Sequence, residues 1–507
     1  MNSTEQGPVD EAMCDVVLIG AGIMSATLGL LLHRLQPDWT IRVYERLPGV
    51  AEESSDAWNN AGTGHAALCE LNYTSERPDG TIDITKAIAI NEQFQVSRQL
   101  WSHLVETGIL GNPGSFINPV PHMTFVQGTD NVGYLRRRYR ALSEHPLFAS
   151  MQFSDDPDTI RRWAPLLIDS RPSGEAMAAT RDVTGTDVDF GSLTRQLFDH
   201  LGAAGVHIGL NQEVRGLRQN PDSTWQLRIR NCHNRAETTT RARFVFVGAG
   251  GWALKLLHKA RIPDARGYAL LPISGRFLRC DNPDVTDRHD AKVYGKAPIG
   301  APPMSMPHLD TRVVDGSRSI LFGPYAGSSP KFLKNGSVLD LPRSIRAHNV
   351  TPLIAMAKDN LALVRLLVTE LTASKSKKLK ALREFVPTAN PQDWSMITAG
   401  QRAQIVKKDP DRGGVLQFGT EVVAAQDGTI AAVLGASPGA STAVPIMLEL
   451  LDRCFPEHRQ QWAPALLEMI PTLGVSLSCN PALAERTMMA TARTLHLSAS
   501  TSSDSTP

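Results

Sequence analysis

The segment DVVLIGAGIMS, residues 15–25, decides the fold of this chain. Four β-favouring apolar residues lead into Gly20 and Gly22, and the small Ser25 then opens an apolar run that extends to Leu32. This order is typical of a strand, a glycine turn and a helix that together bind the pyrophosphate of a dinucleotide. Gly20 permits the tight turn, Gly22 lets the backbone approach a phosphate, and Ser25 allows the helix to pack closely on the strand. We therefore expect the helix N-terminus to hold the phosphates.

The residues that follow support the same interpretation. Residues 40–44 (TIRVY) predict a second strand, and it ends at Glu45, whose carboxylate can accept hydrogen bonds from a ribose. Residues 16–32 carry no charge, but the two glycines interrupt them where the first strand ends, so we expect no membrane-spanning helix here. A Rossmann-like dinucleotide-binding domain is therefore predicted.

Three further segments of small residues indicate which dinucleotide binds. They are WNNAGTGHAAL (58–68), RFVFVGAGG (243–251) and GASPGASTAV (435–444). The first suits backbone packed against a flat ring system, and the third opens a helix whose N–H groups can face an anionic or carbonyl edge. Turns spread so widely over the chain favour one extended cofactor, FAD, over NAD. The expected cofactor contacts in these segments are Asn60, Gly62, Thr63, Gly250, Gly435, Gly439, Ser441 and Thr442.

Composition argues against several other classes of protein. The 507 residues include 52 Lys and Arg and 51 Asp and Glu, so the net charge is +1, whereas proteins that bind nucleic acid usually carry a basic excess. The six cysteines are scattered without a CxxC pair, which favours reduced thiols over a zinc site or a disulfide framework. The first fifteen residues contain no Lys or Arg, so a secretory signal is not indicated. We expect a cytoplasmic protein with no metal and no nucleic-acid partner.

Long stretches of the chain resemble the malate:quinone oxidoreductase family, within the wider class of D-amino-acid-oxidase-like flavoproteins. They include WNNAGTGHAALCELNY (58–73), GTDVDFGSLTRQL (185–197), LREFVPTA (382–389) and AGQRAQIV (399–406), and the resemblance covers roughly residues 14–455. It implies a non-covalently bound FAD, L-malate as substrate and a membrane quinone, ubiquinone or menaquinone, as electron acceptor. It also implies peripheral attachment to the cytoplasmic face of the membrane.

The order of the motifs predicts an α/β chain of two interleaved domains, the second of α+β type. The Rossmann-like FAD-binding domain would combine residues 1–75, 185–270 and 395–455, and an antiparallel-sheet substrate domain that caps the flavin would combine 76–184 and 271–394. Residues 456–507 form a C-terminal extension of unfamiliar sequence, whose Ser/Thr-rich end, from Ser498, is predicted to be disordered.

Local features of the predicted FAD-binding domain lead to further expectations. Residues 205–217 predict a strand whose Val214 would meet the adenine through its backbone. Two segments depart from the family pattern: GAGGWAL (248–254) stands where GAGGGAL is expected, and GYALLPISGR (267–276) stands where GYGGFPVSGQ is expected. The first change places the bulky Trp252 beside a glycine turn. In the second, two lost glycines and a Gln-to-Arg change at Arg276 would alter a hinge or a wall of the active-site cleft.

Oxidation of a 2-hydroxy acid needs a base for the hydroxyl proton and cations for the carboxylates. His308, in a segment similar to one of related 2-hydroxyacid oxidases, is the preferred base, with a purely structural histidine as the alternative. Arg402, in a GxRAQ-type segment that the resemblance places near the flavin, is expected to contact substrate or flavin. Arg312 is either a substrate clamp or a solvated surface residue. His65 serves either proton transfer or the loop that carries it, and His122 is a weaker candidate.

Two basic segments are candidates for membrane contact. Residues 352–371 predict an apolar helix followed by the basic segment Lys375–Lys380, which together could rest on an anionic bilayer and offer quinone an entrance. The alternative is a core-facing helix with a solvated basic end. The run Arg136–Arg140 predicts a solvated helix face.

Two other functions stay open at this point. One is oxidation of L-2-hydroxyglutarate or another 2-hydroxy acid on the same scaffold. The other is a non-catalytic flavin-binding or membrane-scaffold protein, for which the changes at Trp252 and at Ala269–Leu270 leave room.

Overall fold

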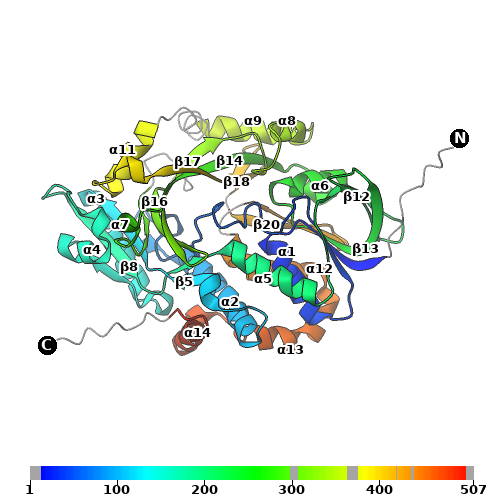
Figure 1. Cartoon of the computed structure of the whole chain (residues 1–507), viewed down its shortest axis with the longest axis horizontal. Coiled ribbons are helices and arrows are strands. Elements are labelled where there is room, and N and C mark those ends of the chain that lie inside the picture. The colour runs from blue at the N-terminus through cyan, green and yellow to red at the C-terminus, as the bar shows by residue number, and fades with distance from the viewer. Residues whose placement is uncertain (1–12, 297–305, 362–374, 418, 436–438, 498–507) are drawn as a thin grey trace.

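A computed structural model of the chain describes residues 13–296, 306–361, 375–417, 419–435 and 439–497. Two large β-sheets organise this part of the chain, and Figure 1 shows helices packed against both of them. Each sheet draws its strands from separate parts of the sequence. The chain therefore folds as two interleaved units, as the order of the motifs predicts.

The first sheet is built around β1 (Cys14–Ile19), the strand that leads into Gly20. Its parallel strands run in the order β10, β2, β1, β13, β21, while β12 and β11 extend it from β13 and β20 pairs with β21, all antiparallel. The bounds are β2 (Ile41–Tyr44), β10 (His207–Gly209), β11 (Gln212–Gln219), β12 (Trp225–Asn231), β13 (Glu237–Val247), β20 (Thr420–Ala424) and β21 (Ile430–Gly435). The Rossmann-like prediction is confirmed.

The helices that cover one face of this sheet come from distant parts of the sequence. Figure 1 shows α1, α5 and α12 there, with α2 beside them. Their bounds are α1 (Ile23–Leu35), α2 (Thr85–Glu106), α5 (Phe190–Ala203) and α12 (Ala443–Cys454). Phe94 and Trp101 of α2 belong to the same apolar core as Leu18 of β1. The sequence assigned α2 to the substrate domain, whereas its buried face completes the core of the first unit.

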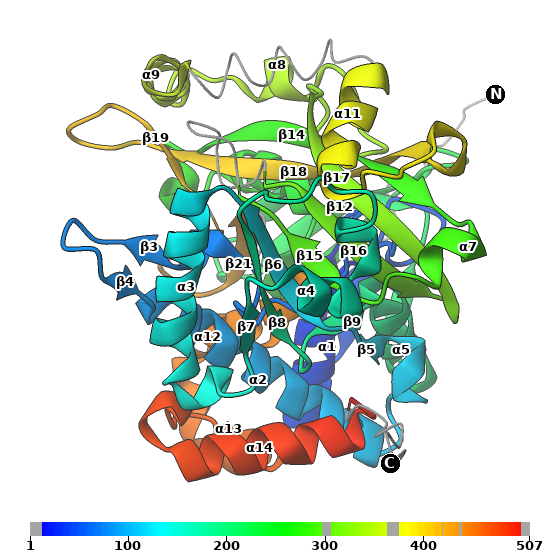
Figure 2. The same ribbon diagram turned by 90° about the vertical axis from the view of Figure 1, so that its left-hand side faces the viewer.

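The chain after residue 455 continues this helical layer. Figure 2 shows α13 (Arg459–Met469) and α14 (Pro481–Thr494) at the base of the molecule, where they pack against α2. The Gln99 side chain of α2 donates to Thr472 Oγ1 at 2.8 Å and accepts from the Thr472 backbone N–H at 3.0 Å. The extension is therefore part of the core as far as residue 497, and the end for which disorder is predicted, 498–507, lies outside the described residues.

The second sheet has the order β19, β18, β14, β17, β16, β15, β6, β8, β7, and its described pairs are antiparallel except for β15 with β6. The bounds are β6 (His122–Gln127), β7 (Gln152–Ser154), β8 (Met177–Asp182), β14 (Ala269–Cys280), β15 (Lys292–Tyr294), β16 (His308–Val314), β17 (Ser317–Ser328), β18 (Ser395–Lys407) and β19 (Val415–Gln417). Residues 395–417, which the sequence assigned to the FAD-binding domain, lie in this sheet because β18 pairs along the length of β14.

Shorter elements complete the described structure. They are β3 (Ser75–Glu76), β4 (Ile82–Asp83), β5 (Ile117–Pro119), β9 (Thr186–Val188), α3 (Thr129–Ser143), α4 (Pro157–Trp163), α6 (Ala253–Lys259), α7 (Pro283–Thr286), α8 (Asp340–Ser344), α9 (Val350–Asp359) and α11 (Lys375–Phe385). In the described ranges, no helix has the length and apolar character needed to cross a membrane. The predicted 352–371 helix is described as far as Asp359, and residues 362–374 lie outside the described residues.

The basic run Arg136–Arg140 lies on α3, but it is not wholly solvated as predicted. Arg138 is fully buried and donates to the backbone oxygens of Ala67 and Leu68 at 3.1 and 3.3 Å. The exposed Arg136 and Arg137 instead pair with carboxylates on neighbouring segments. The helix therefore uses its central arginine to hold the loop that precedes residue 70.

Candidate functional site

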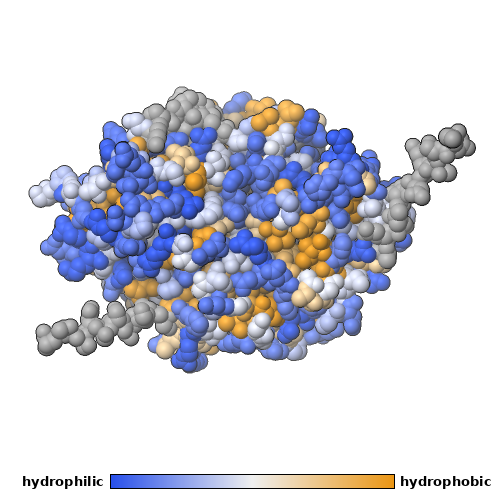
Figure 3. Space-filling view, in the orientation of Figure 1, coloured by the Kyte–Doolittle hydropathy of each residue, from blue (hydrophilic) through white to orange (hydrophobic). Residues whose placement is uncertain are grey.

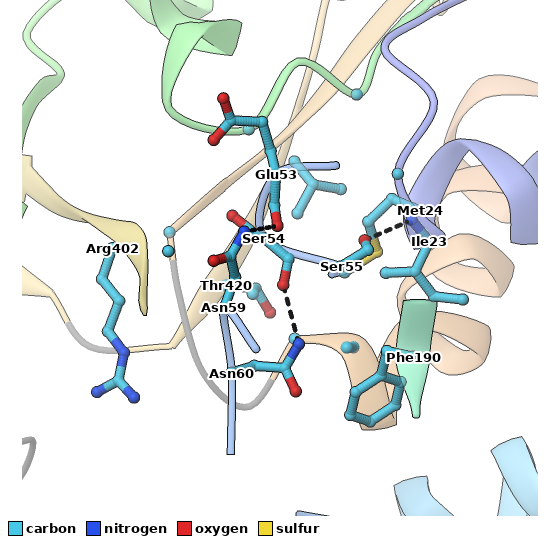
Figure 4. A pocket seen from close by; sticks show the side chains of 18 of the residues that line it. Ile23, Met24, Glu53, Ser54, Ser55, Asn59, Asn60, Phe190, Arg402 and Thr420 are labelled. Atoms are coloured by element: carbon cyan, nitrogen blue, oxygen red, sulfur yellow. Dashed lines mark hydrogen bonds between the residues drawn. The ribbon is translucent and has the colours of Figure 1, made fainter. Parts of the chain in front are cut away.

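One cavity of about 670 Å³ is lined by residues of both sheets. The glycine turn after β1 forms one end of it, and residues of β15, β16 and β18 form the other. Figure 4 shows Ile23 and Met24 of α1 on one side of this pocket and Arg402 of β18 on the other. The cavity therefore joins the predicted dinucleotide site to the predicted substrate residues.

The turn after β1 has the backbone that close approach of a phosphate requires. Gly20 has a φ of +94°, and a Cβ there would lie 2.6 Å from the Gly248 carbonyl oxygen. Gly22 is the N-cap of α1, so the helix begins at the cavity wall. Ser25 is fully buried against Gly248 and does not line the cavity, so it allows packing, as its size predicts, without reaching a cofactor.

Glu45 follows β2 and also lines the cavity. Its carboxylate accepts the backbone N–H groups of Ala21 at 2.7 Å and Leu47 at 2.8 Å. Burial raises the pKa of Glu45 above its usual value, although these two hydrogen bonds oppose the change. Glu45 thus holds the glycine turn in place at the wall of the cavity, where a ribose would be bound.

The wall next to this turn comes from β11 and from the segment after β13. Val214, at an irregularity in β11, and Gly250, with a φ of +53°, both line the cavity. Trp252 lines it too, with Lys255 Nζ 3.7 Å and the Arg46 guanidinium 5.3 Å from the centre of its ring. The tryptophan that departs from the family pattern is therefore part of the wall at the nucleotide end.

A segment that follows β17 closes over the same end. Leu333 lines the cavity, and the two residues after it are tied to the loop that follows β2. The Glu53 carboxylate accepts the backbone N–H groups of Lys334 at 2.9 Å and Asn335 at 3.0 Å. Lys334 Nζ donates to Asn59 Oδ1 at 2.7 Å. The two units are thus joined by hydrogen bonds beside the nucleotide end.

The loop from residue 59 to 65 forms the middle of the cavity wall. Asn60 shapes this loop, since its Nδ2 donates to the backbone oxygen of Ser54 (Figure 4). The same Nδ2 donates to the backbone oxygen of Asp56, and Asn60 Oδ1 accepts the Gly62 N–H. Gly62 has a φ of +62°, and a Cβ there would overlap the buried guanidinium of Arg312. Asn60, Gly62 and Thr63 all line the cavity, as predicted, and the Arg312 guanidinium leaves no room for a Cβ at residue 62.

The opposite side is formed where β21 ends and α12 begins. Gly435, with a φ of +102°, and Gly439, Ser441 and Thr442 all line the cavity, while residues 436–438 lie outside the described residues. Ser441 Oγ is buried and finds no hydrogen-bond partner among the described residues. Small residues, a helix N-terminus and a buried hydroxyl that lacks a protein partner suit a bound dinucleotide that spans the cavity.

His308 is the first residue of β16, and it lines the substrate end of the cavity. Its Nδ1 hydrogen-bonds to Asp310 Oδ2, and its ring lies parallel to Tyr294, with ring centroids 4.5 Å apart. Although burial alone raises the pKa of Asp310, the adjacent His308 and Lys292 lower it overall. An ionised carboxylate only accepts, so Nδ1 carries the hydrogen and Nε2 is left as the basic nitrogen of the neutral ring.

A second histidine–carboxylate pair lies in the loop that follows Thr63. His65 Nδ1 hydrogen-bonds to Glu70 Oε1, and both His65 and the largely buried Glu70 line the cavity. Burial alone raises the pKa of Glu70, but the adjacent His65 lowers it to about 2. Tyr294 joins the two pairs: its hydroxyl hydrogen-bonds to Thr63 Oγ1 at 2.9 Å while its ring contacts His308.

Arg402 projects from β18 into the cavity, and Figure 4 shows its side chain extending away from the strand. Burial lowers the pKa of the guanidinium, which finds no carboxylate and no hydrogen-bond acceptor among the residues that the structure describes. Gln404, on the same face of β18, also lines the cavity, and its buried Oε1 likewise lacks a described partner. A half-buried arginine that faces a cavity without an anion beside it is suited to bind one.

Arg312 lies neither at the cavity nor at the surface, the two places expected for it. Its side chain is fully buried, does not line the cavity, and pairs with Asp187 Oδ1 at 2.5 Å. It also donates to the backbone oxygens of Ala57 at 2.8 Å and Val188 at 3.1 Å. Lys292, also fully buried, shares Asp187 Oδ1 at 2.8 Å. Arg312 is thus neither a substrate clamp nor a surface residue, because its charge is used to anchor the loop that precedes Asn60.

His122 also lies away from the cavity. It is fully buried at the start of β6, and its Nε2 hydrogen-bonds to the backbone of Thr186. Burial lowers the pKa of His122 to about 4, so the ring is neutral at physiological pH. The weaker candidate is therefore structural.

Comparison with known proteins decides the family. A family model described as malate:quinone oxidoreductase matches residues 12–497. The chain belongs to the malate:quinone oxidoreductase family. The match includes the C-terminal extension as far as residue 497, although its sequence is unfamiliar by itself. The matched range also includes the two segments with Trp252 and Ala269–Leu270, so those departures are sequence variations within the family.

Similar proteins named for the same family occur in several bacteria. A probable malate:quinone oxidoreductase of Leifsonia xyli subsp. xyli is 59% identical over 95% of this chain and 98% of its own length. One of Geobacillus sp. (strain WCH70) is 55% identical over 95% of both chains. The rival interpretation as an L-2-hydroxyglutarate oxidase is not favoured by these names.

Solved structures of other enzymes share the fold of this chain. L-α-glycerophosphate oxidase from Mycoplasma pneumoniae, solved with FAD bound, has a TM-score of 0.57 and 15% identity over 87% of this chain and 94% of its own. Glycine oxidase from Geobacillus kaustophilus has a TM-score of 0.55 and 15% identity over the same shares. At such identities the likeness shows the fold alone.

Sequence reasoning missed three residues of the site. Asp310 follows His308 by two positions on a strand. Alternate residues of a strand point to the same side, and this alternation could have revealed Asp310. Tyr294 is brought beside His308 by the pairing of β15 with β16, and no local signal marks it. Glu70 lies five residues after His65 in an irregular loop, where no periodic pattern operates.

Proposed function

We propose that this chain oxidises L-malate to oxaloacetate with a bound FAD and passes the electrons to a membrane quinone. One observation carries the proposal: a single cavity holds a glycine cradle at one end and His308 and Arg402 at the other, with the buried Asp310 bound to His308, in a chain of the malate:quinone oxidoreductase family. FAD would be held by the turn after β1, by Glu45, by the 60–63 loop and by the N-terminus of α12. When bound, the flavin supplies the acceptor for the hydride that leaves C2 of malate.

His308 acts as the base in this proposal. Because Asp310 holds Nδ1–H, Nε2 takes the proton from the C2 hydroxyl, and the Asp310 carboxylate then stabilises the imidazolium. Tyr294 keeps the ring oriented by lying parallel to it. The proton and the hydride thus leave the substrate toward different groups, as oxidation of an alcohol requires.

Arg402 binds the carboxylate next to C2. Its planar guanidinium can hold both oxygens of a carboxylate, which fixes the orientation of C2. Burial strengthens this interaction, since there is little water to screen it. An uncharged Gln404 beside it adds a hydrogen-bonding group without competing for the anion.

A direct experiment tests the function. Purified protein loaded with FAD is mixed anaerobically with L-malate while the flavin absorbance is followed, and a soluble quinone analogue is then added. We expect malate to bleach the flavin and the quinone analogue to restore its colour. L-2-hydroxyglutarate, one carbon longer, serves as the control substrate. Faster bleaching by the longer acid would contradict the proposal, and so would a flavin that no 2-hydroxy acid bleaches.

We also propose that the protein attaches to the cytoplasmic face of the membrane through the surface of α8 and α9, here named the α8–α9 surface. It presents Ile345, Ile354 and Leu361, which are 43, 52 and 57% exposed, beside the exposed basic residues Arg346 and Lys358. Figure 3 shows hydrophobic residues gathered over these two helices, and Figure 2 shows the helices lying on β14 and β18. Exposed apolar side chains beside basic ones suit an anionic bilayer.

The basic segment 375–380 contributes less than the sequence suggests. Lys378 is buried, with its Nζ 5.5 Å from the centre of the Tyr325 ring, whereas Lys377 and Lys380 are exposed. The α8–α9 surface therefore carries the proposal. It also lies over the strand that bears Arg402, so a quinone held in the bilayer would be near the cavity.

Co-sedimentation with vesicles that contain an anionic phospholipid tests this surface. We expect Ile354→Asp to reduce the bound fraction several-fold, because it places a negative charge in the apolar patch. Reduction of the flavin by malate should not change. Met489→Asp is the matched control, since Met489 is 57% exposed on α14, at the opposite end of the molecule (Figure 2). Equal binding of the two variants would exclude the α8–α9 surface.

A further inference from the structure

We infer that Trp252 contacts the adenine base of the bound FAD and holds the dinucleotide more tightly than a glycine at that position would. The inference rests on the FAD-binding part of the proposed function and adds a residue that selects for the adenylate half of the cofactor. Residue 252 is of interest because residues 248–254 read GAGGWAL where the family pattern, GAGGGAL, has a glycine.

Trp252 lies where the base of a dinucleotide would be bound. The glycine turn after β1 and Glu45, at the expected ribose position, line the same cavity and are hydrogen-bonded to each other. The backbone N–H of Gln212, the first residue of β11, donates to the Glu45 carbonyl oxygen at 2.7 Å. Val214, two residues further along β11, lines the cavity, and Trp252 packs against the apolar cluster that contains it. The two residues therefore form the wall just beyond the ribose.

The indole of Trp252 is held in place by groups outside the cavity. Its Nε1–H donates to Asp340 Oδ2 at 3.4 Å, and the same oxygen accepts the backbone N–H of Ser337 at 2.9 Å. Lys255 Nζ lies 3.7 Å from the centre of the ring, but Lys255 is not one of the described residues that line the cavity. The part of the indole that lines the cavity is thus left for a ligand.

The wall around the indole suits a flat aromatic base. Leu256 and Leu333 line the cavity together with Val214, and they supply apolar surface. The Arg46 guanidinium also lines it and lies 5.3 Å from the centre of the indole ring. Aromatic rings and guanidinium groups both stack on the faces of a nucleobase, whatever its hydrogen-bonding edge. A glycine at residue 252 would offer the base no such surface.

A contact with adenine divides the binding of the cofactor between two regions. Asn60 and Thr63, in the middle of the cavity wall, are expected to meet the flavin half, whereas Trp252 meets only the adenylate half. A change at residue 252 should therefore weaken every ligand that contains adenine and leave binding of the flavin half unaffected. The two halves can be supplied separately, as ADP and as FMN.

Calorimetric titration of the flavin-free, full-length protein with FAD, ADP and FMN tests the inference. We expect Trp252→Gly to raise the Kd of FAD and of ADP by about 5- to 100-fold, the usual effect of losing one aromatic contact with a base. The Kd of FMN should stay within about 2-fold, since distant contacts act independently. Trp252→Phe, which keeps an aromatic face, should recover most of the affinity for ADP.

Two further variants separate a contact with the base from a general role in the fold. Trp252→Leu keeps an apolar side chain but no ring, so it should show the same pattern with a smaller rise, and it serves if glycine lowers the stability of α6. Trp163→Gly is the matched control, because it removes a half-buried tryptophan of α4 that does not line the cavity. It should leave the binding of all three ligands unchanged.

The outcomes distinguish this inference from the proposed function. If the unchanged protein binds no FAD, the proposed function fails, and the inference, which rests on it, fails too. If the protein binds FAD but the Trp252→Gly and Trp252→Leu variants bind ADP as tightly as the unchanged protein, the inference alone fails. Equal weakening of ADP and FMN would also overturn it, since the substitution would then have altered the cavity as a whole.

Discussion

The phenol ring of Tyr294 lies parallel to the imidazole of His308, with ring centroids 4.5 Å apart and an interplanar angle of 7°. The pairing of β15 with β16 creates this contact, because Tyr294 and His308 are register partners. His308, the proposed base, therefore owes its orientation to a neighbouring strand as well as to Asp310. Each of the two supports can be removed separately.

Removal of the ring contact should slow the reaction modestly. Tyr294→Phe keeps the parallel rings and loses only the hydrogen bond to Thr63, whereas Tyr294→Leu loses the aromatic contact as well. We expect the rate of flavin bleaching by malate to stay within about 3-fold in the first variant. In the second it should fall about 2- to 10-fold further, the usual worth of an aromatic pair. Stopped-flow absorbance measures the rates of both variants. Equal rates would show that the ring contact does not contribute to the reaction.

Removal of the base should slow the reaction far more. We expect His308→Gln to retain FAD and to lower the rate of flavin bleaching by about 10²- to 10⁴-fold. Asp310→Asn should lower it about 10- to 100-fold, because an amide cannot stabilise the imidazolium as a carboxylate does. Asp290→Asn, at an exposed ion pair with Arg318, is the control and should react normally. Near-normal bleaching by His308→Gln would remove His308 from the mechanism.

His122 should make the folded state sensitive to mild acid. Burial lowers its pKa from 6.5 to about 4, so the folded protein binds this proton less tightly than the unfolded chain does. Its contribution to stability is complete above about pH 6.5 and is lost as the pH falls toward 4, by up to about 3 kcal/mol. Urea unfolding across this range should show a smaller decline in the His122→Gln variant. The exposed His233→Gln is the control, and an equal decline in all three proteins would refute the assignment.

Removal of the buried charge of Asp187 should lower the stability of the folded protein substantially. Asp187→Asn leaves Arg312 and Lys292 buried without their shared carboxylate, and we expect the free energy of unfolding to fall by about 3–5 kcal/mol. Asp158→Asn, at an exposed pair with Arg161, should cost a few tenths of a kcal/mol at most. Denaturant unfolding of the two variants provides the comparison. Similar losses would mean that the buried cluster is not an anchor.

Gly62 should tolerate no side chain. Gly62→Ala introduces a Cβ into the Arg312 guanidinium at a φ of +62°, so we expect lower thermal stability and weaker retention of FAD. Gly80→Ala is the matched control: its φ is +82° but no atom lies within 4 Å of the added Cβ, so it should cost only about 1 kcal/mol. If the two variants behave alike, backbone conformation rather than the packing of Arg312 is decisive.

The sequence predicted what depends on local pattern. The strand, glycine turn and helix at residues 14–35, and the glycine contacts around the cavity, follow from short-range rules of backbone and packing. The roles of α2 and of residues 395–417 did not follow, because they depend on which sheet or core a segment joins. Arg312 shows the same limit. It is expected either to bind a substrate carboxylate or to lie at the surface, whereas it pairs with Asp187, 125 residues earlier in the sequence.

The carboxylate of Glu53, which accepts the backbone N–H groups of Lys334 and Asn335, has a consequence for exchange of the cofactor. The contact ties the segment after β17 to the loop after β2 beside the nucleotide end. Weakening this contact should shorten the residence time of the bound cofactor, so that the protein loses its colour faster on dilution.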